Sequence, residues 1–311
     1  MHPFPVLPDY DFPAGFFQHR SGHRQHYVDV GQGPTVLMLH GNPSWSYYYR
    51  HLLKSLSGEY RCIAPDHIGM GRSDKPSAGQ YDYHLAQRVE DLDALIEHLV
   101  AERGLPESGI TLVLHDWGGM IGMAWACRHP QRVARLVILN TGAFPNPKAR
   151  RLPLALRLVR DSAFGAWLVT RFNAFAWGAT RFGVCRRLDP AVQAALLSPY
   201  DSPAHRIGTL KFVQDIPLTP SDRGFELVRA TGAALPQFGD RPAAIFWGLR
   251  DFVFDQAFLA VWRKLLPAAR LATYADAGHY VLEDAHERIV PELLDFLRTT
   301  DSGRSAAGQH R

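Results

Sequence analysis

The chain has 311 residues, 46% of them hydrophobic and 21% charged, which suits one large globular domain with room for an insertion. Its net charge of +4 is mild, and no recognised binding motif accompanies it, so we expect no nucleic-acid partner. No apolar run approaches the length needed to cross a bilayer, so we expect no membrane span.

Neither the start of the chain nor its cysteines indicate secretion. Residues 1–5 lack a basic region followed by an apolar one, as a secretory signal requires. The three cysteines, Cys62, Cys127 and Cys185, lie far apart, and their odd number does not suit a disulfide framework. We therefore expect a protein of the reducing cytoplasm.

The first half of the chain alternates short apolar strands with helices. The spacing of Val89, Leu92, Leu95 and Ile96 is that of an amphipathic helix. Because continuous apolar strands separated by helices are typical of parallel sheets, we predict an α/β fold whose mostly parallel sheet has helices on both faces. The predicted strands are 26–30, 35–39, 60–64, 110–114 and 133–139, and the predicted helices are 89–100 and about 119–128.

The strand rhythm stops near residue 144 and returns with strands at 243–247 and 271–274 and a helix over about 286–297. The intervening segment indicates several helices without strands, so we predict an inserted cap over the carboxyl ends of the strands, where such sheets bind ligands. The tail is small and polar, which predicts disorder. The expected division is a core of 1–143 and 236–298, a helical cap of 144–235 and a disordered tail of 299–311.

The cap segment is rich in basic and aromatic residues. The basic excess indicates a solvated helical face or a docking surface. The large apolar side chains belong either to the cap's own core or to a pocket wall, and spacing does not separate these uses. The basic residues are Lys148, Arg150, Arg151, Arg157, Arg160, Arg171, Arg181, Arg186 and Arg187, against Asp161 and Asp189; the apolar ones are Phe164, Trp167, Leu168, Phe172, Phe175 and Trp177.

The sharpest motif is residues 115–119, His-Asp-Trp-Gly-Gly, directly after a buried strand. It predicts a nucleophile elbow, in which a tight glycine-flanked turn projects Asp116 from the sheet at a helix N-terminus that keeps the carboxylate ionised. Leu114 departs from this pattern, because serine enzymes prefer glycine two positions before the nucleophile. The alternative is that Asp116 only caps the helix.

Three further residues are predicted to join Asp116. In His40-Gly41-Asn42-Pro43, which follows a strand, the loop is expected to donate a backbone N–H to an anion, and Asn42 to face the same cavity; an Asn-Pro turn is the alternative. Asp251 lies just past one strand and His279 past the next. The order nucleophile, acid, base is that of α/β-hydrolases, so we predict His279 as base and Asp251 as the acid that orients it.

No Gly-x-Ser-x-Gly occurs, which argues against a serine esterase. A carboxylate nucleophile attacks an electrophilic carbon to form an enzyme ester, which a histidine-activated water can cleave. Carbon–halogen bonds, epoxides and strained lactones suit this chemistry. No cofactor and no metal is expected.

Residues 40–46, 65–76 and 115–119 resemble the haloalkane dehalogenase superfamily of α/β-hydrolases, and the similarity extends over nearly the whole chain. An acid at Asp251, with Asn42 and Trp117 as paired donors, resembles its third group. The second group would require a carboxylate near Asn140, and the first a second tryptophan in place of Asn42. Residues 8–13 and 66–76 look most like the β-lactone decarboxylases of bacterial long-chain olefin biosynthesis.

The resemblance implies that Asn42 and Trp117 donate N–H bonds to a leaving anion, either halide or carboxylate, although Trp117 could instead simply pack at the elbow. It implies a small hydrophobic substrate. The leading hypothesis is decarboxylation of dialkyl β-lactones, with contacts to other olefin-pathway enzymes. Haloalkane hydrolysis is second. Epoxide hydrolysis is third, because Asn42 replaces an aromatic residue and no clear pair of cap tyrosines is found. A non-catalytic binding module is fourth.

Overall fold

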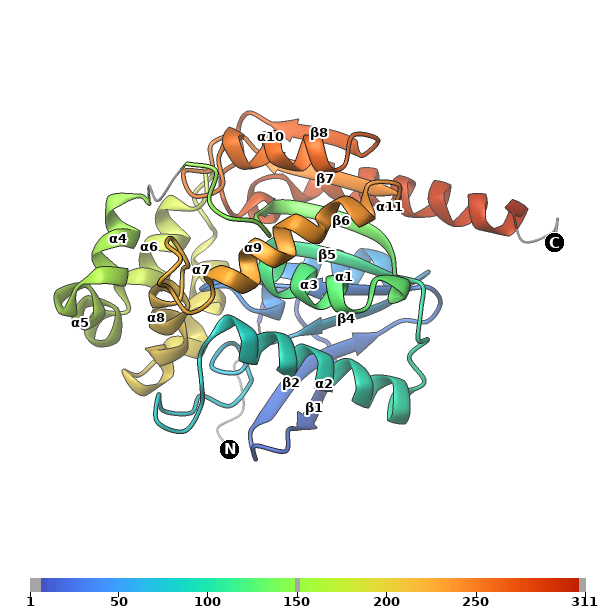
Figure 1. The fold of residues 1–311 in the computed structure, drawn as a ribbon. Coiled ribbons are helices and arrows are strands. Elements are labelled where there is room, and N and C mark those ends of the chain that lie inside the picture. Colours follow the sequence, from blue (N-terminus) through green and yellow to red (C-terminus); the bar gives the residue numbers. More distant parts are fainter. Residues whose placement is uncertain (1–6, 149–151, 308–311) are drawn as a thin grey trace.

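The computed structural model describes residues 7–148 and 152–307, and Figure 1 shows its eight-stranded sheet with helices around it. The strand order is β1-β2-β4-β3-β5-β6-β7-β8. Strands β1 and β2 pair antiparallel, as do β2 and β4, and all other neighbours are parallel. The strands are β1 (Ala14–Gln18), β2 (Arg24–Val30), β3 (Thr35–Leu39), β4 (Arg61–Pro65), β5 (Ile110–Asp116), β6 (Val133–Thr141), β7 (Ala243–Gly248) and β8 (Arg270–Tyr274).

Helices cover both faces of the sheet, because side chains alternate across each buried strand. Leu37 and Leu112 join the core beneath α2, α3 and α10, whereas Val36 and Val113 join the core beneath α1 and α11. This confirms the predicted α/β class. The covering helices are α1 (Arg50–Leu56), α2 (Leu85–Arg103), α3 (Trp117–Arg128), α10 (Gln256–Leu265) and α11 (Val281–Ala307), with short 3-10 turns at η1 (Ser46–Tyr49), η2 (Pro130–Arg132) and η5 (Leu235–Phe238).

The segment between β6 and β7 is helical, as predicted, and most of it forms a group at the left of Figure 1, away from the sheet. Residues 149–151 of the predicted cap, including Arg150 and Arg151, lie outside the described residues. The helices of the segment are α4 (Leu154–Asp161), α5 (Ala163–Phe172), α6 (Ala174–Phe182), α7 (Pro190–Leu197), α8 (Ile207–Gln214) and α9 (Phe225–Ala234), with η3 (Ser198–Tyr200) and η4 (Ala204–Arg206).

Helix α9 lies beside α3 in Figure 1 and belongs to the packing of the sheet domain. Val228 is buried in the core beneath α3, and the thiol of Cys127 on α3 contacts the carbonyl oxygen of Thr231 at 3.9 Å. Helix α9 therefore packs with the sheet domain, although it lies within the predicted cap of residues 144–235.

The last helix is longer than predicted. Helix α11 continues to Ala307, past residue 299, where the sequence predicted a disordered tail. Its later turns are fixed by Asp301, which accepts hydrogen bonds from Arg135 on β6 and, at 3.1 Å, from the hydroxyl of Tyr60. Residues 308–311 lie outside the described residues.

Three elements were not predicted from the sequence: β1, α1 and α10. Strand β1 is a half-exposed edge strand without a buried apolar run, and α1 has only seven residues. Helix α10 did carry a signal, because Phe258, Leu259 and Trp262 share one buried face behind an Asp255 cap. In the described part of the chain, no helix has both the length and the apolar character that crossing a bilayer requires.

Candidate active site

Asp116 lies at the last position of β5, where the chain turns sharply into α3. Its backbone has φ 50° and ψ −124°, a conformation that costs a non-glycine residue about 1–3 kcal/mol. The first turn of α3 is pressed against the neighbouring strands, since a β-carbon on Gly118 would overlap the carbonyl oxygen of Leu39 and one on Gly119 would overlap Thr141. The geometry is that of a nucleophile elbow, with the carboxyl group projecting from the sheet.

The unusual Leu114 is accommodated by a glycine elsewhere. A β-carbon on Gly122, in the second turn of α3, would overlap the side chain of Leu114. The helix therefore packs closely on the sheet at this point, because the small residue lies on the helix and the large one on the strand.

The loop after β3 lies directly against the Asp116 carboxyl group. The backbone N–H of Asn42 donates to Oδ1 of Asp116 at 2.6 Å, and a β-carbon on Gly41 would overlap the same carboxyl group. The side-chain Nδ2 of Asn42 donates to the carbonyl oxygen of Thr209 at 2.9 Å, which uses one of its two hydrogens. Asn42 and Trp117 both line the cavity above Asp116, so the structure brings together the two side chains predicted to bind the leaving group.

His279 lies between the two carboxylates. Its Nδ1 is 2.9 Å from Oδ2 of Asp251, and its Nε2 is 3.6 Å from Oδ2 of Asp116. Asp251 is held in turn by the backbone N–H groups of Val253 and Phe254, which donate to Oδ1 at 2.7 and 3.1 Å. The three residues predicted as nucleophile, base and acid therefore form one chain of contacts.

Burial and charge act in opposite directions on these groups. Burial raises the pKa of Asp116, although the facing His279 and the N–H groups of Asn42 and Trp117 work against this. Burial by itself lowers the pKa of His279, but the charge and hydrogen bond of Asp251, together with the charge of Asp116, outweigh it and leave that pKa raised.

Two supporting residues were not predicted. Asn140, at the end of β6, donates to Oδ2 of Asp251 at 3.1 Å and exchanges hydrogen bonds with both backbone groups of Gly248. His115, beside the nucleophile, is fully buried, and its Nε2 lies 2.9 Å from the carbonyl oxygen of His279. The signal for both was a polar residue at the end of an otherwise apolar buried strand.

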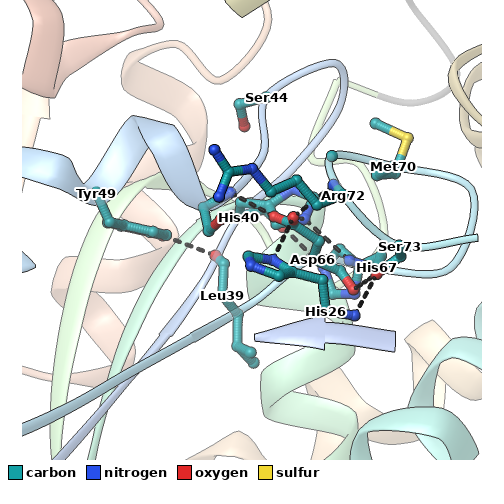
Figure 2. Close-up of polar contacts among 12 residues, drawn as sticks. His26, Leu39, His40, Ser44, Tyr49, Asp66, His67, Met70, Arg72 and Ser73 are labelled. Atoms are coloured by element: carbon teal, nitrogen blue, oxygen red, sulfur yellow. Dashed lines mark hydrogen bonds and ion pairs between the residues drawn. The ribbon is translucent and has the colours of Figure 1, made fainter. Parts of the chain in front are cut away.

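A buried network that includes His40, Asp66 and His67, drawn in Figure 2, holds the loop of Gly41 and Asn42 in place. His40 Nδ1 lies 2.7 Å from the carbonyl oxygen of Gly41, and its Nε2 accepts the backbone N–H of His67 at 3.1 Å. His67 Nε2 lies 2.9 Å from the carbonyl oxygen of His40. This pattern assigns the neutral form to His40, and burial lowers the pKa of both rings.

Asp66 is the centre of the same network. Its carboxylate accepts the backbone N–H groups of Ser46 at 2.6 Å and Arg72 at 2.7 Å, and His26 Nδ1 lies 2.8 Å away. Burial alone would raise its pKa, but the His26 contact and the N–H donors leave it well below its usual range. The segment 65–76, which the sequence marked only by resemblance, thus supports the Asn42 loop.

Asp284 connects the cap to the loop that carries His279. Its carboxylate accepts backbone N–H groups from Cys185 at 2.9 Å and Arg186 at 2.9 Å in the cap, and from Gly278 at 2.8 Å. The N–H of Tyr280 donates to the carbonyl oxygen of Gly183 at 2.8 Å. The position of the base is therefore tied to the position of the cap.

A cavity of about 970 Å³ extends from Asp116 into the cap. Asp116, Asn42, Trp117 and His279 line it at one end, and Asn146 and Lys148 are further polar lining residues. The remaining wall is mainly apolar, and no tyrosine of residues 7–148 or 152–307 lines it. The apolar wall includes Phe144, Leu152, Leu156, Val159, Leu168, Phe175, Val213, Ile216, Val228, Phe254 and Phe258.

Comparison with known proteins agrees with this geometry. The family model of the alpha/beta hydrolase fold matches residues 34–286. The chain is 49% identical to a cis-3-alkyl-4-alkyloxetan-2-one decarboxylase of Shewanella oneidensis over 92% of this chain and 89% of that protein. It is 32% identical to a haloalkane dehalogenase of Mycolicibacterium paratuberculosis, covering 94% and 95%.

The crystal structure of haloalkane dehalogenase DbeA from Bradyrhizobium elkani superposes with a TM-score of 0.83 at 27% identity, covering 94% of this chain and all of that one. The shared fold, the matched length and the elbow at Asp116 give one conclusion. The chain belongs to the α/β-hydrolase fold family, in the branch that includes oxetanone decarboxylases and haloalkane dehalogenases.

Proposed function

We propose that this protein decarboxylates cis-3-alkyl-4-alkyl β-lactones to cis-alkenes and carbon dioxide, as a step of long-chain olefin biosynthesis. The observation that carries the proposal is the 49% identity to an oxetanone decarboxylase over 92% of the chain, against 32% to a haloalkane dehalogenase of similar coverage. The substrate is a small hydrophobic molecule, which suits the apolar cavity.

The proposed reaction balances with Asp116 as its only covalent participant. A carboxylate oxygen attacks the alkyl-substituted ring carbon that is bonded to the ring oxygen, not the carbonyl carbon. The bond between this carbon and the ring oxygen breaks, which leaves an Asp116 ester and a free substrate carboxylate. The carbon–carbon bond to this carboxylate then breaks, and its electrons form the double bond between the two former ring carbons. The bond between the attacked carbon and the Asp116 oxygen breaks at the same time. Alkene, carbon dioxide and free Asp116 result, and no water or proton is consumed.

The stereochemistry of this route supports attack at that carbon. Attack from the side opposite the ring oxygen inverts the carbon and places the Asp116 ester anti to the departing carboxylate. Anti elimination then leaves the two alkyl groups on the same side. A cis-lactone therefore gives a cis-alkene, whereas attack at the carbonyl carbon would give a mixed anhydride with no carboxylate to lose.

The other site residues would stabilise the negative charges that develop during the reaction. As the ring opens, negative charge moves onto the substrate carboxylate, where the indole N–H of Trp117 and the remaining amide hydrogen of Asn42 would stabilise it. His279, held by Asp251 at Nδ1, faces Oδ2 of Asp116 at 3.6 Å from its Nε2, where it would stabilise the carboxylate released in the second step. In this reaction the pair is electrostatic support, whereas in a dehalogenase His279 would be the base that activates water.

The cavity provides room for two alkyl chains beside the ring. At about 970 Å³ it is at the upper end of the range of small-molecule sites, and its wall is mainly apolar. The ring would lie on Asp116 and the chains along the cap. The absence of tyrosine from the described lining argues against epoxide hydrolysis, which the cap sequence already disfavoured.

A paired product assay tests the proposal. At equal enzyme, alkene formation from a synthetic cis-dialkyl β-lactone is measured by gas chromatography beside halide release from primary bromo- and iodoalkanes. We expect rapid alkene formation and little halide. Fast halide release without alkene would assign the protein to the dehalogenases. Asp116→Asn is the control in both assays, because it should abolish both activities.

Two finer expectations belong to the same proposal. The protein would act in the cytoplasm, and it would contact the other enzymes of the pathway. Co-purification of tagged full-length chain from its native host tests the second expectation.

A further inference from the structure

The cap exposes large apolar side chains on the neighbouring helices α4, α5 and α6, called here together the cap patch: Leu154, Phe164, Trp167, Phe172 and Trp177. Leu154 is 82% exposed and the four aromatic residues 50–57%. Phe164 stacks on Trp167, which meets Phe172 edge to face. Single exposed apolar residues are ordinary, but adjoining exposed aromatic rings mark an interaction surface.

The tryptophans show how selective this exposure is. Of the chain's seven tryptophans, only Trp167 and Trp177 are exposed, and the other five are 4% exposed or less. Neither exposed tryptophan lines the cavity. Their rings therefore serve neither the core nor substrate contact.

Unpaired arginines are interleaved with the rings. Arg157, Arg171 and Arg181 are exposed and make no ion pair within the described residues. The guanidinium of Arg171 lies 5.7 Å from the centre of the Phe172 ring. Asp161, the sole acidic residue of segment 152–182, is paired with Arg160. The patch is therefore aromatic and positively charged.

The patch also adjoins the mouth of the substrate cavity. Leu158 on α4 and Phe182 on α6 both line the cavity and remain exposed, at 42% and 64%. In Figure 1 these helices lie on the side of the molecule away from the C-terminus. An object that covers the patch would thus face the cavity opening.

We infer that the cap patch binds an anionic lipid bilayer surface, so that the cavity mouth opens toward the membrane. Aromatic and arginine side chains are the combination that settles at the headgroup level, and the uncompensated positive charge complements anionic phospholipids. The purpose rests on the proposed function, because a dialkyl lactone and its alkene partition into the bilayer. The enzyme would take substrate from the membrane and return product to it.

Vesicle flotation of the full chain tests this inference without any substrate. Vesicles of phosphatidylcholine alone are compared with equimolar phosphatidylcholine and phosphatidylglycerol. We expect binding to the anionic vesicles and its loss in high salt. On binding, the tryptophan emission should shift to the blue. This shift should disappear in the double variant Trp167→Phe/Trp177→Phe, which keeps Trp117 and should still float.

Matched variants distinguish binding through the cap patch from binding through net charge or nonspecific hydrophobic contact. Arg171→Gln/Arg181→Gln should weaken binding about 30-fold, whereas Arg263→Gln/Lys264→Gln, which removes the same charge from exposed positions on α10, should not. Phe164→Ser/Trp167→Ser should weaken binding more than about tenfold, whereas Leu271→Ser, at an exposed apolar position on β8, should not. Circular dichroism checks that each variant is folded.

Three results would overturn the inference. One is no flotation with anionic vesicles at low salt. Another is equal loss of binding in the α10 control. The third is a concentration-dependent dimer, broken by the patch variants, without vesicle binding, which would make a second copy the occupant. Because these assays contain no lactone, membrane binding without alkene formation would count against the proposed function alone.

Discussion

The active-site edge of the sheet and the cap differ in how their side chains are held. At the sheet edge, Asp116, His279 and Asp251 are 7% exposed or less, and each is fixed by contacts from other elements. In the cap, α5 and α6 present an apolar cavity wall on one side and exposed rings on the other. From this difference we infer that the sheet edge carries the chemistry and that the cap sets substrate preference.

This division has a physical reason. A reacting carboxylate must stay within a fraction of an ångström of its partners, which hydrogen bonds at strand ends achieve. Long alkyl chains need only an apolar space of suitable length, which helices with few directional contacts provide. Changes at the sheet edge should therefore affect rate with every substrate, and changes in the cap should affect preference.

The largest effect is expected for Asp116→Asn, which replaces the nucleophile by an amide of the same shape. Turnover should fall by about 10⁴-fold or more with every substrate, while the folded structure is retained. Steady-state rates and the thermal unfolding midpoint check this with freshly purified protein. Near-normal activity in a sample shown by mass spectrometry to be free of deamidation would remove Asp116 from its role.

The next effect concerns the acid. Asp251→Asn should lower the pKa of His279, because the charge of Asp251 is what raises it. Where a histidine base is obligatory, this change is expected to lower the rate by about 10²-fold or more. If lactone decarboxylation needs no base, its rate should fall by less than this. Histidine NMR titration and lactone turnover are the measurements.

A paired variant serves as the control for Asp251. Asn140→Asp/Asp251→Asn places a carboxylate on the other side of the same hydrogen bond, since Asn140 Nδ2 lies 3.1 Å from Asp251 Oδ2. In this double variant, the pKa of His279 should be higher than in Asp251→Asn alone. If Asp251→Asn alone changes neither the pKa nor the rate, Asp251 is not the acid that orients His279.

A third effect is a loss of stability in mild acid, to which buried histidines at the sheet edge contribute together with His51 on α1, whose pKa burial lowers to about 3. Burial lowers the pKa values of His40, His67 and His115, so the unfolded chain binds protons that the folded chain refuses. Below about pH 6.5 the free energy of unfolding should fall by about 1.4 kcal/mol per pH unit for each of them.

His279 does not cancel this slope. Its raised pKa adds stability that is already complete below the unfolded value and is lost only as pH rises through the folded one. Urea unfolding between about pH 6.5 and about pH 5.5, where the contribution of His279 is already complete, is the measurement. A free energy of unfolding that stays level over this interval would mean that the three rings are not held neutral.

The smallest effects are expected at Gly178 on α6, which lines the cavity and has open space where a β-carbon would stand. Gly178→Ala should raise stability by up to about 1 kcal/mol through helix propensity. Gly178→Leu should reduce turnover of the longest lactones about tenfold relative to short ones, because it fills the chain-binding space. Gly58, which has equal space but lies outside the cavity, provides the matched control: Gly58→Leu should not change chain-length preference. An unchanged preference in Gly178→Leu would move chain recognition away from the cap.

Sequence alone predicted three residues that the structure brings together, because their signals are local. Asp116, Asp251 and His279 each follow an apolar strand, and parallel strands necessarily end at the same edge of a sheet. Asn140 and Asp284 were missed because their partners, at Asp251 and in the cap backbone, depend on how separate segments pack. The cap shows the same limit: Leu168 and Phe175 line the cavity whereas Phe164 and Trp177 are exposed, a distinction absent from their spacing.

The position of helix α11 determines how the molecule is oriented when it is attached through its C-terminus. The helix begins two residues after His279 and, with 27 residues, extends about 40 Å across the sheet domain, ending on the side away from the cap (Figure 1). A C-terminal handle would therefore anchor the enzyme to a bead or electrode with its cavity mouth facing outward. A fused second enzyme would stand behind the sheet, so such a fusion would gain proximity but no direct channel between the two sites.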